Sequence, residues 1–147
     1  MTPHNVIRVE FGSAFDMLDF VQVVSDHVGR MAGLDEDQNH WVSVAIRESV
    51  VNAIKHGNRN DSSKKVIVEF SPVPPTEPRE LVIRIEDQGD GFEPEEVADP
   101  LAPENILKSS GRGIFLIRNF MDEVTHRKIP GGGMEIRMVK KVAPSEP

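Results

Sequence analysis

RESVVNAIKHGN, residues 47–58, predicts the end of an amphipathic helix around which the rest of the chain can be interpreted. Glu48, Asn52 and His56 recur every four residues, so on a helix they form one polar stripe. The stripe interrupts an otherwise apolar helix, and polar groups on a buried helix cost free energy unless something satisfies them. Gly57 and Asn58 then end the helix, because both residue types tolerate a left-handed backbone. A metal–nucleotide ligand would satisfy the stripe.

Length and composition indicate one globular domain. At 147 residues, with 38% hydrophobic and 28% charged residues, the chain is expected to form a single domain over residues 1–147. There is no cysteine, which excludes disulfides and thiolate metal sites. A net charge of -7 argues against direct nucleic-acid binding, which needs a basic patch, and leaves protein partners with basic surfaces open.

Nothing in the sequence indicates a membrane protein. The apolar runs are too short to cross a bilayer. Residues 1–5 lack the charged-then-apolar layout of a signal peptide. A cytoplasmic location with no membrane partner is therefore expected.

Hydrophobic periodicity predicts the order of strands and helices. Residues 92–110 have no clear period and contain three prolines, which is typical of a long functional loop. The order predicts an α+β fold, a two-layer α/β sandwich with a mixed, mostly antiparallel sheet and the helices on one face. Strands are expected at 7–11, 66–70, 81–86, 123–128 and 134–139, and helices through about residue 31, at 36–56 and at 114–121.

Helix boundaries have recognisable signals. Ser13 is expected to cap the first helix and Gly33 to close it. Asp35 and Gln38 have the spacing of a capping box for the second helix. The apolar side chains expected to pack in the core or at an interface include Phe15, Leu18, Val21 and Trp41.

Asn52 and its neighbours on the polar stripe are suited to a metal–phosphate site. The side-chain oxygen of asparagine is a neutral ligand that suits Mg²⁺, a metal that usually also takes substrate phosphates. Glu48, one turn earlier, can accept a proton from an attacking hydroxyl or water. Lys55 can supply positive charge to a phosphate.

Two glycine-containing segments complete the pattern. DQGDG at residues 87–91 follows the strand at 81–86, and its first carboxylate can accept a hydrogen bond from an exocyclic amine such as that of adenine. The glycines let the backbone pass close to a flat ligand. GRG at residues 111–113 opens the helix at 114–121, where backbone N–H groups favour phosphate, and Ser110 adds a hydroxyl donor.

Each feature alone also has an ordinary structural explanation. A buried asparagine is often a satisfied polar group, and an Asp-x-Gly-x-Gly sequence is often a plain turn. Arg112 is equally well explained as a solvated surface residue. The occurrence of all three segments in this order, each in its expected context, favours a ligand site.

The combination resembles the GHKL (Bergerat-fold) ATPases, which include histidine kinases and gyrase-type ATPases. The resemblance extends from about residue 7 to 141. Glu48-x-x-x-Asn52 matches the N box of that family, residues 87–91 the G1 box and residues 111–113 the G2 box. It implies the Bergerat ATP-binding fold, ATP and Mg²⁺ as cofactors, and an ATP lid at about 92–112.

The resemblance also implies a role for each matched residue. Glu48 would be the general base for a serine hydroxyl, Asn52 would hold Mg²⁺ on the ATP phosphates, and Asp87 would bind the adenine amino group. Met134 stands where many family members have a threonine, so a hydroxyl contact near adenine is missing. The other residues expected to bind the nucleotide are Lys55, His56, Gly89, Gly91, Ser110, Gly111, Arg112 and Gly113.

Residues 45–58 and 111–124 look like the RsbW/SpoIIAB subgroup, bacterial anti-sigma factors that are also serine-protein kinases. This resemblance implies a sigma factor and a STAS-domain anti-anti-sigma protein as partners, and a homodimer. The implied activity is ATP-dependent phosphorylation of the STAS partner. Two alternatives remain: a partner-switch module that binds nucleotide with little or no kinase activity, and a stand-alone histidine kinase-like ATPase domain. The presence of Glu48 favours the kinase.

Overall fold

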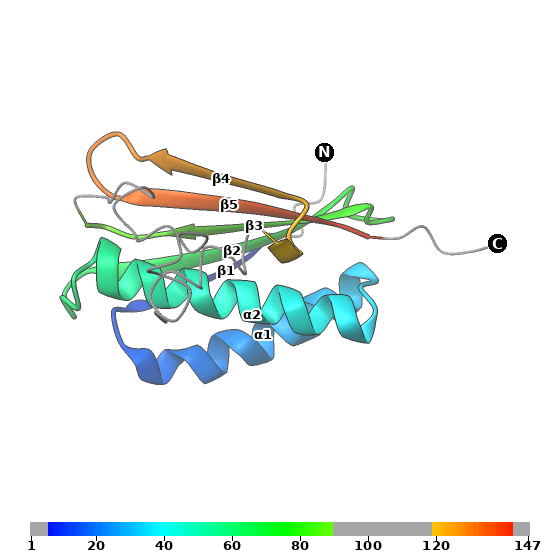
Figure 1. Cartoon of the computed structure of the whole chain (residues 1–147), viewed down its shortest axis with the longest axis horizontal. Helices are drawn as coiled ribbons and strands as arrows, with labels where there is room; N and C mark the ends of the chain where they lie inside the picture. The colour runs from blue at the N-terminus through cyan, green and yellow to red at the C-terminus, as the bar shows by residue number, and fades with distance from the viewer. Residues whose placement is uncertain (1–5, 90–118, 143–147) are drawn as a thin grey trace, which may run out of the picture.

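A five-stranded sheet with two helices on one face makes up the described part of the chain (Figure 1). The structure is a computed structural model that describes residues 6–89 and 119–142. The strand order is β1-β2-β3-β5-β4, and every neighbouring pair is antiparallel. In chain order the elements are β1 (Ile7–Gly12), the 3-10 turn η1 (Phe15–Met17), α1 (Leu18–Ala32), α2 (Glu36–Asn52), the π-helix η2 (Ala53–Gly57), β2 (Lys65–Val73), β3 (Glu80–Glu86), β4 (Glu123–Lys128) and β5 (Met134–Lys141).

This architecture confirms the predicted α+β class. The expected helix at 114–121 and the expected lid at 92–112 lie outside the described residues, except that Asn119 and Phe120 are helical. Among the helices that the structure describes, none has the length and apolar character needed to cross a membrane.

The core lies between the helices and one face of the sheet. Alternate residues of the central strands point towards the helices, and Phe70, Ile83 and Met138 are cross-strand neighbours with no exposed surface. Fully buried residues of α1 and α2, such as Val21 and Ile46, belong to the same cluster. Full burial of one such side chain stabilises the fold by about 1.5–3 kcal/mol.

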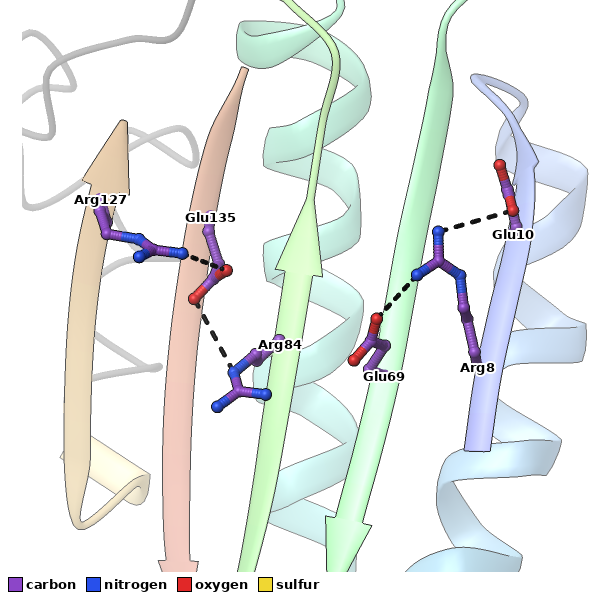
Figure 2. A network of polar contacts seen from close by, with 6 residues as sticks. All are labelled: Arg8, Glu10, Glu69, Arg84, Arg127 and Glu135. Atoms are coloured by element: carbon purple, nitrogen blue, oxygen red, sulfur yellow. Dashed lines mark hydrogen bonds and ion pairs between the residues drawn. The ribbon is translucent and has the colours of Figure 1, made fainter. Parts of the chain in front are cut away.

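The opposite face of the sheet carries charged side chains (Figure 2). Arg8 on β1 contacts Glu69 on β2 at 3.0 Å. Glu135 on β5 lies between Arg127 on β4, at 3.1 Å, and Arg84 on β3, at 3.9 Å. Burial, together with the nearby Glu135, raises the pKa of Glu86 on this face. The two faces therefore differ sharply, and among residues 6–89 and 119–142 helices cover only the face that holds the core.

The start of α2 and the end of α1 follow the sequence signals. Gln38 N–H donates to Asp35 Oδ1 at 2.7 Å and Asp35 N–H donates to Gln38 Oε1 at 3.2 Å, which confirms the capping box. Gly33 follows α1 with φ of 96°, a left-handed conformation that confirms it as the terminating residue.

Two local predictions were wrong. Ser13 does not cap the first helix, because its hydroxyl donates to the Lys64 carbonyl and the turn begins after Ala14 without a side-chain cap. Asn58 is not left-handed, since its φ is -84° and the left-handed residues are Arg59 and Asn60. Phe15 was expected in the core or at an interface; it is 46% exposed in the short turn before α1, so it is not in the core.

Trp41 lies at the surface of α2 rather than in its buried face. Its side chain stacks on Phe120, with ring centroids 4.0 Å apart and planes 10° apart. It remains 38% exposed, so the expectation of packing is met by this contact rather than by full burial.

Candidate nucleotide site

A pocket lies between the end of α2 and the helix-facing side of β3, β4 and β5. It brings together Asn52 and Asp87, which the sequence placed in two separate motifs. Ile85, Ile136 and His126 are neighbours in one row across the sheet and form its floor. The described lining residues are Ser49, Asn52, Ala53, Ile85, Asp87, His126, Met134 and Ile136.

Asp87 is held by backbone groups at the end of β3. It is 4% exposed, and its Oδ1 accepts hydrogen bonds from Gly89 N–H at 3.0 Å and Met134 N–H at 3.2 Å. Burial raises the pKa of Asp87, and the two backbone hydrogen bonds oppose that shift only in part. Neither bond uses Oδ2, so, as far as the described residues go, this oxygen remains an acceptor for a ligand.

Three glycines let the backbone close around Asp87. A side chain on Gly57 would collide with Oδ2 of Asp87, and one on Gly89 would collide with the Gly57 carbonyl. Gly133 has φ of 102°, and a side chain there would collide with the Asp87 carbonyl. Of the three, only Gly89 was predicted to belong to the pocket, and none of these close approaches was foreseen, because each joins segments far apart in the chain.

The helix that carries Asn52 ends in a π-turn. The Asn58 N–H donates to the Ala53 carbonyl at 2.7 Å, five residues back. Such turns often occur at functional sites. This turn carries the chain one residue further before it reverses, which explains why Arg59 and Asn60, rather than Asn58, are left-handed.

Glu48 and His56 of the polar stripe, and the neighbouring Lys55, are not among the described residues that line the pocket. Glu48 and His56 are half-buried and Lys55 is exposed. Burial, followed by the adjacent Lys55 charge, lowers the pKa of His56. Glu48 is one helical turn before Asn52 and shares its side of the helix.

Met134 lines the pocket, in agreement with the position expected next to an adenine site. Two backbone groups of Met134 bond to Asp87. The Met134 N–H donates to the Asp87 carboxylate, and the Met134 carbonyl accepts from the Asp87 N–H at 3.0 Å. Its thioether replaces the hydroxyl that a threonine would offer, so the wall there is apolar.

His126 is a lining residue that was not predicted from the sequence. Strand alternation offered a signal, since His126 lies two residues after Val124 on β4 and therefore on the same side of the strand. Ser49 was also missed. It is buried, and its hydroxyl donates to the Ala45 carbonyl at 2.8 Å.

Five predicted residues lie outside the described part of the chain. They are Gly91, Ser110, Gly111, Arg112 and Gly113.

Comparisons with known proteins agree with this arrangement. A family model for the histidine kinase-like ATPase domain matches residues 16–140. The serine-protein kinase RsbW of Staphylococcus aureus is 29% identical over 142 residues, covering 92% of this chain and 86% of the relative. The protein of the same name from S. aureus strain JH9 is 28% identical with the same coverage. The solved structure of the mycobacterial sensor histidine kinase MprB superposes with a TM-score of 0.56 at 14% identity, covers 97% of this chain and 100% of its own, and shares the fold.

Proposed function

The chain belongs to the histidine kinase-like ATPase domain family, and we propose that it is an ATP-dependent serine-protein kinase that acts as an anti-sigma factor. The observation that carries the proposal is the single pocket lined by both Asn52 and Asp87. The similarity to relatives named serine-protein kinase supports the same activity here. We propose that the substrate is a serine hydroxyl of a STAS-domain anti-anti-sigma protein.

The adenine end of the proposed site is at Asp87. Its Oδ2 accepts a hydrogen bond from the adenine amino group, while Oδ1 stays bound to Gly89 and Met134. Ile85, Ile136 and the Met134 side chain supply apolar contact to the ring. A buried carboxylate that accepts a specific hydrogen bond discriminates strongly against bases that lack the matching donor.

The phosphate end of the proposed site is at the C-terminal turns of α2. Asn52 holds Mg²⁺, which when bound neutralises charge on the phosphates. Lys55 and His56 follow Asn52 along the chain. In this proposal the other residues that contact the nucleotide are Lys55, His56, Gly89, Gly91, Ser110, Gly111, Arg112 and Gly113. Glu48 would accept the proton that the serine hydroxyl loses as its oxygen bonds to the γ-phosphorus of ATP, while the bond from that phosphorus to the bridging oxygen breaks and ADP leaves.

Exposed apolar side chains on α1 and the preceding turn support protein partners. Phe15, Phe20 and Val23 are 46%, 53% and 68% exposed. Such side chains are common at protein–protein contacts. We propose that the partners are a sigma factor, the STAS protein and a second copy of the chain.

Two further properties belong to the proposal. Residues 1–147 form one domain, and the protein works in the cytoplasm.

The test separates binding from transfer. ATP binding is measured by calorimetry with and without Mg²⁺, and phosphate transfer by labelled ATP with purified STAS-domain proteins as candidate acceptors. Glu48→Ala should abolish transfer while ATP affinity stays within about twofold of wild type. Glu36→Ala, at the opposite end of α2, is the matched control and should leave both unchanged.

Transfer at the wild-type rate by Glu48→Ala would contradict the assignment of the base. ATP binding without transfer by the wild-type protein would instead favour the nucleotide-binding partner-switch module. If the wild-type protein bound no ATP, the assignment of the pocket as a nucleotide site would be contradicted.

A further inference from the structure

We infer that Asn58 is a positioning residue for the nucleotide site, because it holds the turn that carries Asp87 against the end of the helix that carries Asn52. The inference rests on the proposed function of that site. Asn58 has no exposed surface, and it lies outside the described lining of the pocket. It therefore acts through its neighbours.

Three hydrogen bonds close a ring through Asn58, Lys65 and Gln88, which belong to three separate segments. Asn58 Nδ2 donates to the Lys65 carbonyl at 2.9 Å. Lys65 N–H donates to Gln88 Oε1 at 2.7 Å. Gln88 N–H donates to Asn58 Oδ1 at 2.8 Å. We call these three residues the Asn58 ring.

A fourth bond anchors the ring to the start of the chain. Asn58 Nδ2 also donates to Ser13 Oγ at 2.8 Å, and the Ser13 hydroxyl donates in turn to the Lys64 carbonyl. This contact explains why Ser13 is buried instead of capping the first helix. The Asn58 side chain thus connects β1, the helix end, β2 and the turn after β3.

An amide is the side chain that meets these demands. Its nitrogen donates to two acceptors and its oxygen accepts from one donor. A carboxylate of the same shape would face the Lys65 carbonyl without a proton to donate. An apolar side chain would leave the buried partners unsatisfied, which is costly.

The ring controls the distance between the two halves of the pocket. Asn58 follows Gly57, whose Cα lies against the Asp87 carboxylate. Gln88 lies between Asp87 and Gly89, and Gly89 packs directly on the Gly57 carbonyl. Without the ring, Asp87 stays bonded to Met134 of β5, but the turn that carries Asp87 loses its hydrogen bond to the Asn58 side chain at the helix end, so the spacing between Asp87 and Asn52 is less firmly fixed.

Asn58→Ala tests the inference, with Asn39→Ala as the matched control. Asn39 is also a buried asparagine, 3% exposed, and its Nδ2 makes two hydrogen bonds to Asp26. It lies about 20 Å from Asn52 along α2. Both variants should lose stability, but only Asn58→Ala should weaken ATP–Mg²⁺ binding, by about tenfold in calorimetry at a temperature where both are folded.

Gln88→Ala is a second variant that should fold whatever happens to Asn58→Ala. Gln88 is exposed, so its truncation opens the Asn58 ring without emptying a buried site. We expect a weaker effect on ATP affinity, about threefold. Unchanged affinity in both ring variants, or an equal loss in Asn39→Ala, would overturn the inference.

Amide hydrogen exchange in the ATP-free protein tests the ring even if the wild-type protein binds no ATP. The Gln88 and Gly89 amides should exchange faster in Asn58→Ala than in Asn39→Ala. Equal exchange in the two variants would show that the ring does not hold the turn. If exchange is faster in Asn58→Ala but the wild-type protein binds no ATP, the role of the ring in holding the turn is supported and the proposed function is contradicted.

Discussion

Asp87 shows how much of the site depends on backbone contacts. Its carboxylate is held by the N–H groups of Gly89 and Met134, and its main chain pairs with Met134. The neighbouring residues Gly57 and Gly133 make this possible, since a side chain on either would collide with Asp87. At the scale of single residues, the geometry of the pocket therefore depends on the lack of a side chain at these glycines.

Gly133→Ala should damage the site more than Gly131→Ala. Both glycines have positive φ, 102° and 94°, so alanine at either costs about 1–2 kcal/mol of backbone strain. Only at residue 133 does the added carbon meet the Asp87 carbonyl, whereas residue 131 has open space. Chemical denaturation should show a clearly larger loss for Gly133→Ala, with weaker ATP binding. Equal losses would contradict the close approach.

Asp87 should also give a characteristic dependence of stability on pH. Burial raises its pKa in the folded protein above the ordinary value of 3.8. Between pH 3.8 and the raised pKa, the unfolded chain has lost the Asp87 proton and the folded chain keeps it. The contribution of Asp87 to the free energy of unfolding therefore falls as pH rises through this window. The Asp87→Asn variant has no titrating side chain at this position. Its free energy of unfolding should therefore increase relative to that of the wild type as pH rises through the window.

Asp61→Asn is the control with the opposite sign. Hydrogen bonds from the Ser63 hydroxyl and N–H lower the pKa of Asp61. The wild type should therefore gain stability relative to Asp61→Asn as pH rises from below the lowered pKa through 3.8. The same trend for both variants would contradict the assigned burial of Asp87.

At the scale of elements, α2 is the helix on which the site depends. It begins at a capping box and continues without interruption into the π-turn that ends beside Asp87. Asn39 near its start is bonded to Asp26 of α1, and Asn52 at its end lines the pocket. The start of the helix is thus a structural region and its end the candidate site.

Asp35→Ala should cost about 1 kcal/mol of stability, because it removes the side-chain bond that satisfies the Gln38 N–H. Asp37→Ala is the control, since it removes an acid from the same first turn without breaking the cap. Thermal unfolding compares the two variants with wild type. ATP affinity should be unchanged in both, and equal stability loss would argue against the cap.

At the scale of the whole molecule, the two faces of the sheet differ in the side chains they carry. One face is covered by α1 and α2 and contains the core (Figure 1). The other carries the charge pairs around Glu69 and Glu135 (Figure 2). The pocket lies at the border of the core, where the end of α2 meets β3 and β5, so the same packing that stabilises the fold also brings the two motifs together.

The sequence determined the elements, because local signals produce them. Alternating or β-branched apolar runs predicted strands, helical spacing predicted α1 and α2, and Asp35 with Gln38 predicted where α2 begins. The motif order also pointed to Asn52 and Asp87, which do line one pocket. These features depend on residues within a few positions of one another.

The tertiary structure decided which distant residues meet. Gly57 and Gly133 flank Asp87, His126 joins the pocket floor, and Asn58 bonds to Ser13, Lys65 and Gln88. Ser13 and Asn58 were predicted from local capping rules, and both were wrong because a buried polar group takes whichever partner the fold brings within reach. Strand register and helix packing set those partners, and neither is encoded in any short stretch of the chain.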